Sequence, residues 1–151
     1  MLKLSEDKPL PELIEQFITS AEQSKRLNSL NSLVLLLYKE KLTLLQLTES
    51  LETYLTSKEG VYRARAILLY YELLDRVKSL ELTENELKYL MNFFVLKTKD
   101  IHCVLEAGKS FNILLERYSS STNISDEYQQ FVITKWLEIF DGEFFHTPSY
   151  T

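Results

Sequence analysis

Residues 42–47 read LTLLQL and residues 82–87 read LTENEL, so the same leucine-threonine opening recurs after 40 residues. A third apolar run restarts at Ile124-Ser125, 42 residues further along the chain. A period of about 40 to 47 residues with two helical segments in each unit is typical of HEAT and armadillo solenoids. The spacing therefore predicts an all-α fold, a HEAT-type α-solenoid of about three stacked antiparallel helix pairs and a lone C-terminal helix.

A second series of similar residues is interleaved with the first. An acidic residue, an alanine and a leucine occupy positions 59, 66 and 73, and the same types recur at 100, 107 and 114. Ala66 and Ala107 are small residues in otherwise bulky stripes, so we expect them where paired helices approach most closely. Leu73 and Leu114 are expected in the core.

The chain contains little that would interrupt a helix. Its three prolines are Pro9, Pro11 and Pro148, and it has only three glycines in 151 residues. So few prolines and glycines indicate helices joined by short loops. We expect one domain, with helix pairs near residues 12–38, 43–79 and 83–118 and a helix at 125–141.

Four residues are expected to cap these helices. Thr43 and Thr83 each have a glutamine or glutamate three residues on, which is the pattern of a capping box. Asp100 is expected to cap the sixth helix and Ser125 the seventh.

Two helices have apolar stripes that bear on how they pack. On the second helix, spacing of three and four residues predicts a buried stripe of Leu27, Leu30, Val34, Leu37 and Tyr38. On the last helix the residues expected inward are Tyr128, Phe131, Val132, Trp136, Ile139 and Phe140. With Phe144 and Phe145 following, these are too many for one contact face, so we expect part of this surface to be covered by further repeats or another subunit.

Composition excludes several classes of function. The formal net charge is −5, with scattered Lys and Arg, whereas a nucleic-acid binder of this size would show a basic stripe. The single cysteine, Cys103, excludes an internal disulfide and fits a reducing compartment. The longest apolar runs are too short to cross a bilayer, and residues 1–7 lack the apolar region of a secretory signal. We therefore expect a soluble intracellular protein that binds neither nucleic acid directly nor membrane.

Asp100, His102 and Cys103 are the nearest approach to a reactive cluster. Neighbouring residues on a helix diverge by about 100° each, so these side chains are not expected to converge on one metal or substrate. The sequence predicts no catalytic, cofactor or metal site, and no cofactor. A small all-α enzyme with a site near His102 and Cys103 is the remote alternative. The hydroxyl-rich residues 119–122 are a linker or a site of phosphorylation.

Partner-facing residues are expected on the inner helices, opposite their buried stripes. These residues are Arg65, Glu72, Glu106 and Lys109, and reversing their charges is expected to leave thermal stability nearly unchanged. Arg63 and Arg65 have two interpretations: they face a partner, or at least one braces the preceding inter-helix turn.

Residues from about 23 to 115 resemble the N-terminal HEAT region of the Mms-nineteen family, the large adaptor of the cytosolic iron–sulfur cluster targeting complex. The resembling segment covers about two thirds of the chain, and three stretches within it carry the resemblance. The first is LNSLV at 30–34 with KLTLLQL at 41–47; the second is LETYLT at 51–56 with RARA at 63–66; the third is LTENEL at 82–87 with Phe93-Phe94 and KTKDIH at 97–102.

The resemblance implies a non-catalytic scaffold in iron–sulfur protein maturation. Its implied partners are the assembly subunits and client enzymes such as DNA helicases, and the implied location is cytoplasm and nucleus. Family members have many more repeats, and the docking of assembly partners is associated chiefly with C-terminal repeats that this chain lacks. A generic HEAT or armadillo interaction module in trafficking or signalling is the alternative.

Overall fold

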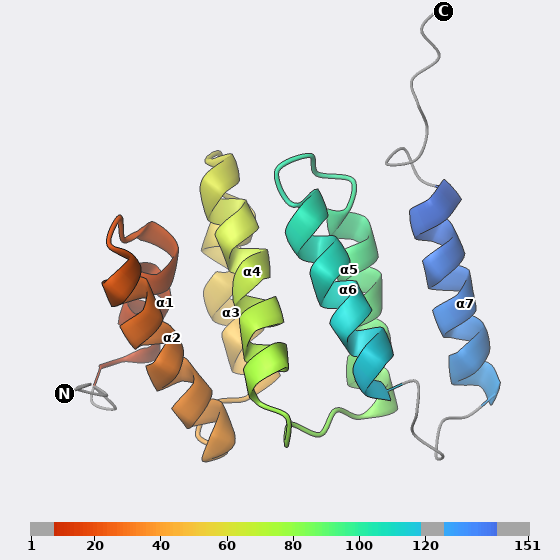
Figure 1. Cartoon of the computed structure of the whole chain (residues 1–151), viewed down its shortest axis with the longest axis horizontal. Helices are drawn as coiled ribbons and strands as arrows, with labels where there is room; N and C mark the ends of the chain where they lie inside the picture. Colours follow the sequence, from red (N-terminus) through yellow and green to blue (C-terminus); the bar gives the residue numbers. More distant parts are fainter. Residues whose placement is uncertain (1–7, 119–125, 142–151) are drawn as a thin grey trace, which may run out of the picture. The chain divides into compact units, whose positions relative to one another are not determined.

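The computed structural model describes residues 8–118 and 126–141, which form helices and no strand. The chain divides into two compact units, Met1–Leu80 and Glu81–Thr151. The first contains α1 (Leu10–Thr19), α2 (Gln23–Tyr38), α3 (Leu44–Leu55) and α4 (Gly60–Arg76). The second contains α5 (Glu84–Lys97), α6 (Val104–Tyr118) and α7 (Asp126–Asp141) (Figure 1). The predicted all-α fold is confirmed, and α1–α2, α3–α4 and α5–α6 are helical hairpins of the HEAT type.

Helix α4 contacts α1, α2 and α3, and α1 likewise contacts the other three helices of the first unit. The fully buried residues of α4 lie on one side, within about 160° of its circumference, and half-buried residues such as Ala64 and Leu68 lie on the remaining side. Its buried residues are Ala66, Ile67, Leu69, Tyr70, Leu73 and Leu74. Opposite them lie Leu13, Ile14, Phe17 and Ile18 of α1, Leu30, Leu33 and Leu37 of α2, and Leu47 and Leu51 of α3.

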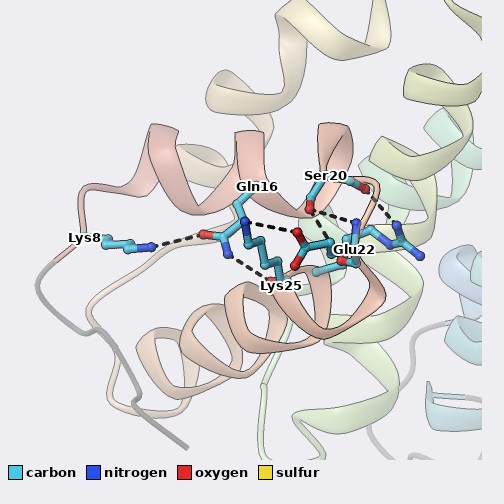
Figure 2. Close-up of polar contacts among 6 residues, drawn as sticks. Lys8, Gln16, Ser20, Glu22 and Lys25 are labelled. Atoms are coloured by element: carbon cyan, nitrogen blue, oxygen red, sulfur yellow. Dashed lines mark hydrogen bonds and ion pairs between the residues drawn. The ribbon is translucent and has the colours of Figure 1, made fainter.

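Polar side chains complete the contacts between these helices. The buried Tyr70 hydroxyl on α4 lies 2.7 Å from the Thr48 hydroxyl on α3. On α1, Gln16 accepts a hydrogen bond from the Lys8 ammonium at 3.2 Å and donates one to the Lys25 carbonyl at 3.2 Å (Figure 2). Burial raises the pKa of Tyr54 on α3, and Glu15 of α1 raises it further, which reflects how closely α1 and α3 pack.

A serine and an arginine stabilise the connection between α1 and α2 by hydrogen bonds. The Ser20 hydroxyl accepts the Glu22 N–H at 3.2 Å, a local turn typical of serine (Figure 2). Arg26, one turn into α2, donates from Nη1 to the Ser20 carbonyl at 2.7 Å. The guanidinium thereby satisfies a carbonyl that follows the end of α1.

The connection between α3 and α4 repeats this arrangement. The Ser57 hydroxyl accepts the Glu59 N–H at 3.1 Å, and Arg63 donates from Nη1 to the Ser57 carbonyl at 2.8 Å. Both connections share the pattern Ser-x-Glu-x-x-x-Arg. The interpretation that one arginine at the start of the fourth helix braces the preceding turn is confirmed for Arg63.

The connection between α5 and α6 differs, and the cap expected at Asp100 is wrong. Helix α6 begins only at Val104. The Asp100 carboxylate accepts the His102 N–H at 3.0 Å inside a separate turn, and the Cys103 N–H donates to the Asp100 carbonyl at 2.9 Å. Because the Asp100 carboxylate accepts a hydrogen bond within this turn, Asp100 stabilises the connection that precedes α6 and does not cap the first turn of α6.

The two predicted capping boxes are confirmed. The Thr43 hydroxyl accepts the Gln46 N–H at 3.1 Å, and the Gln46 side chain accepts the Thr43 N–H at 3.0 Å. Thr83 and Glu86 form the same pair of bonds at 3.1 and 3.0 Å. These boxes fix the first residue of α3 and of α5.

In the second unit α5 lies between two partners, α6 and α7. The core of this second unit comprises Leu87, Leu90, Met91, Phe94 and Val95 of α5, Ala107, Phe111, Ile113 and Leu114 of α6, and Tyr128 of α7. The Tyr128 hydroxyl lies 3.7 Å from the Met91 sulfur.

Part of the apolar surface of α7 is exposed, as expected, but it includes Trp136, which was expected inward. Tyr128 is buried and Phe131, Val132 and Ile139 are half-buried, but Trp136 is 45% exposed, beside the exposed Ile133 and Leu137. The stripe is wider than the α5 surface that it covers, which is why Trp136 is not inward. Ser125, residues 119–122, the Phe140 side chain, Phe144 and Phe145 lie outside the described residues.

Core truncation should destabilise both units. Leu73 is 1% exposed and Leu114 is fully buried, so Leu73→Ala and Leu114→Ala each leave a cavity. We expect each to lower the free energy of unfolding by about 2–5 kcal/mol in urea denaturation. Leu45→Ala, at a position that is 69% exposed, is the control and should change it by less than about 0.5 kcal/mol. Equal effects at all three positions would show that the buried faces are assigned wrongly.

Arg65 has a structural contact that the sequence did not predict. Its Nη1 donates to the Ile18 carbonyl at 2.6 Å and so joins α4 to the last turn of α1. We expect Arg65→Met to cost about 1–3 kcal/mol, because the carbonyl of the buried Ile18 loses its partner. Glu72→Gln on the same helix removes only a surface ion pair and should cost less than about 1 kcal/mol. If Arg65→Met unfolds at the wild-type urea concentration, this contact contributes nothing to stability.

Candidate functional site

A groove runs along the seam between α2 and α4, the inner helices of the two hairpins in the first unit. Figure 1 shows these helices as neighbours, and they are in contact. Two hollows of about 300 and about 520 Å³ lie along the seam. The first is lined by Phe17, Gln23, Arg26, Leu27, Leu30, Arg65, Leu68, Glu72 and Arg76. The second is lined by Asn31, Val34, Leu35, Tyr38, Arg76, Val77, Lys78 and Ser79. Arg76 lines both, so we treat them as one α2–α4 groove.

The order of the lining residues gives the relative direction of the two helices. Arg26, early in α2, shares a hollow with Arg65, early in α4. Tyr38, at the end of α2, shares the other with Val77, directly after α4. The two helices therefore run parallel, and the groove extends along the 16 residues of α2, a length of about 24 Å.

Apolar side chains that were predicted to be buried line this groove instead. Leu27 is 44% and Tyr38 is 67% exposed, so their assignment to the core of the second helix is wrong. Leu30 and Leu37 are buried as predicted, and Val34 is half-buried. The apolar arc of α2 is wider than the surface that α1 and α4 cover, and the surplus faces the groove.

The groove has a positive charge in an acidic protein. Its charged lining residues are Arg26, Arg65, Arg76 and Lys78, against the single Glu72. The whole chain has a formal net charge of −5. Glu72 is paired with Arg76 at 3.1 Å, and Lys78 lies 3.7 Å from Asp75. Basic residues therefore outnumber acidic ones in the lining, whereas acidic residues outnumber basic ones in the whole chain.

Two of these arginines are held in place by the backbone at the end of α1. Arg65 donates to the Ile18 carbonyl, and Arg26 donates to the Ser20 carbonyl two residues on. A guanidinium has five N–H donors, and each of these bonds uses one. The two cations are therefore anchored at one end of the groove with donors left for a ligand.

The four predicted partner-facing residues belong to two separate sites. Arg65 and Glu72 both line the α2–α4 groove. Glu106 and Lys109 lie on α6 in the second unit, where Glu106 is half-buried and Lys109 is exposed. The Ser110 hydroxyl donates to the Glu106 carbonyl at 2.8 Å.

Sequence reasoning missed several lining residues, although their spacing offered a signal. Positions 65, 68, 72 and 76 recur every three or four residues, which places them on one face of α4. On α2, positions 27, 30, 34 and 38 do the same. Arg76 belongs to the α4 set and Arg26 precedes the α2 stripe, so a search for basic residues beside a surplus apolar stripe would have found them.

The residues weighed for chemistry do not form a reactive cluster. His102 is exposed, whereas Cys103 is 1% exposed with its sulfur 3.5 Å from an Asp100 carboxylate oxygen. Across residues 8–118 and 126–141, no three His, Cys, Asp or Glu side chains are arranged to hold a metal ion. None of the helices in these ranges is long and apolar enough to span a membrane.

Comparison with known proteins places the chain in a family. The family model described as "Dos2-interacting transcription regulator of RNA-Pol-II", for the N-terminal region of MMS19, matches residues 48–145. The MMS19 nucleotide excision repair protein homolog of Dictyostelium discoideum is 28% identical over 107 residues, which is 70% of this chain and 10% of that protein. The homolog of the same name in Arabidopsis thaliana is 30% identical over 122 residues, which is 80% of this chain and 11% of that protein.

The chain thus spans about a tenth of the length of these curated relatives. No solved structure matches it. Because the family model covers well over half of the chain, and because the matched residues include α4 and the whole of α5 and α6, the chain belongs to the MMS19 family and corresponds to its N-terminal region.

Proposed function

We propose that this chain is a non-catalytic scaffold segment of an adaptor that delivers iron–sulfur clusters to enzymes of DNA repair and transcription. The observation that carries the proposal is the family match over residues 48–145, which the nucleotide excision repair names of the relatives support. The adaptor works in the cytoplasm and nucleus. Its partners are the assembly subunits and client enzymes such as DNA helicases.

The architecture supports a role in binding proteins. Stacked helix pairs present extended surfaces on their inner helices, and partners bind there in other solenoids. The α2–α4 groove is such a surface, with exposed apolar side chains and anchored guanidinium groups. Leucine and arginine side chains of this kind suit recognition of another polypeptide and do not include a nucleophile or general base.

The test uses the full-length protein that contains this segment. We expect a tagged copy, purified from cells, to enrich the subunits that assemble cytosolic iron–sulfur clusters together with client helicases. Depleting the protein should lower the incorporation of labelled iron into those clients, and an untagged wild-type copy should restore it. If neither group of proteins is enriched and client iron is unchanged by depletion, the proposed function is wrong.

A further inference from the structure

We propose that the α2–α4 groove binds an acidic amphipathic helix of a partner protein. This inference rests on the proposed adaptor function and names the chemistry of one partner.

The apolar part of the groove matches one face of a helix. Leu27 and Leu68 line the first hollow, and Val34, Leu35 and Tyr38 line the second. A helix lying along a groove inserts anchors at positions i, i+3 or i+4, and i+7. A groove about 24 Å long accommodates about four turns, which is enough for two anchors in each hollow.

The charges specify the polar ends of this partner helix. Arg26 and Arg65 lie at one end, and Arg76 lies further along at the junction of the hollows with Lys78 beyond it. Arg65 and Arg76 are 11 residues apart on one helix, a rise of about 16 Å. We therefore expect carboxylates about three turns apart on the partner, each able to accept paired hydrogen bonds from a guanidinium.

Charge complementarity favours a helical polypeptide over a nucleic acid in this groove. A nucleic acid would require phosphate contacts along a continuous basic stripe, whereas apolar side chains separate the basic groups here. The choice of a partner protein rests on the proposed adaptor function, because α7 of a second copy also has an exposed apolar stripe, at Ile133, Trp136 and Leu137. Its exposed Glu127 and Glu138 are 11 residues apart, so a second copy is the competing occupant. Both occupants are outcomes of the test.

The test measures binding of a defined probe to the whole chain. The probe is a fluorescein-labelled helical peptide of about 16 residues, with leucines at i, i+4 and i+7 and a glutamate pair at each end. Two matched peptides replace the glutamates by glutamine or by lysine. By fluorescence anisotropy we expect the glutamine peptide to bind about tenfold more weakly than the acidic one, and the lysine peptide more weakly still. Affinity for the acidic peptide should fall as salt is raised.

Variants of exposed residues locate the site. Leu27→Glu and Arg76→Glu, both in the groove, should weaken binding of the acidic peptide at least about tenfold. Leu45→Glu, on the exposed face of α3, is the matched control and should bind like the wild type. Circular dichroism confirms that each variant is folded. Arg26 and Arg65 are left unchanged because they also brace the fold.

The proposal is wrong if the acidic peptide does not bind, or if the acidic and lysine peptides bind equally. It is also wrong if the α3 control variant weakens peptide binding as much as the groove variants do. Stronger competition by a single-stranded oligonucleotide than by unlabelled peptide would assign the groove to a nucleic acid. Self-association of the chain that Leu27→Glu abolishes, together with no binding of the acidic peptide, would assign the groove to a second copy. Because the assay contains no iron–sulfur protein, its failure is distinct from failure of the co-purification.

Discussion

The fold of the first unit depends on the burial of one helix, α4, against three others. The apolar side of α4 must be covered, and α1, α2 and α3 provide that cover. The face of α4 that remains carries Arg65, Leu68, Glu72 and Arg76. Because α2 packs beside it in parallel, this remaining face and the surplus apolar face of α2 necessarily border the same groove. The candidate site is thus a direct consequence of how the core is packed.

The groove shares two arginines with the scaffold. Arg65 and Arg26 satisfy carbonyls at the end of α1, and the same side chains supply positive charge to the groove. This arrangement fixes the cations before a ligand arrives, which reduces the side-chain entropy lost on binding. It also means that replacing either arginine changes stability and binding together, whereas Arg76, whose described partner is Glu72 on its own helix, separates the two effects.

The sequence predicted most of the helices because local signals mark their ends. The capping boxes at Thr43 and Thr83 and the near absence of proline required little knowledge of tertiary structure. Tertiary context decided the rest. Periodicity finds an apolar stripe but not the width of the surface covering it, which is why Leu27 and Trp136 were placed inside. The expected end at residue 38 is where α2 ends, although no glycine marks it: Glu40 adopts a left-handed conformation, φ 60°, and the Lys41 N–H donates back to the Leu36 carbonyl at 2.8 Å. Arg65 could not be assigned to α1 because its partner is 47 residues away.

The central claim is that the α2–α4 groove is a partner-binding surface of the adaptor, and photo-crosslinking in cells tests it most directly. A photoreactive amino acid is introduced into the full-length protein at Leu27 in the groove and, separately, at Leu45 on α3, since both positions are exposed. The account predicts a crosslink from position 27 to an iron–sulfur assembly subunit or client enzyme, with none from position 45. Crosslinks to these proteins from position 45 alone, or equal crosslinks from both, would contradict it.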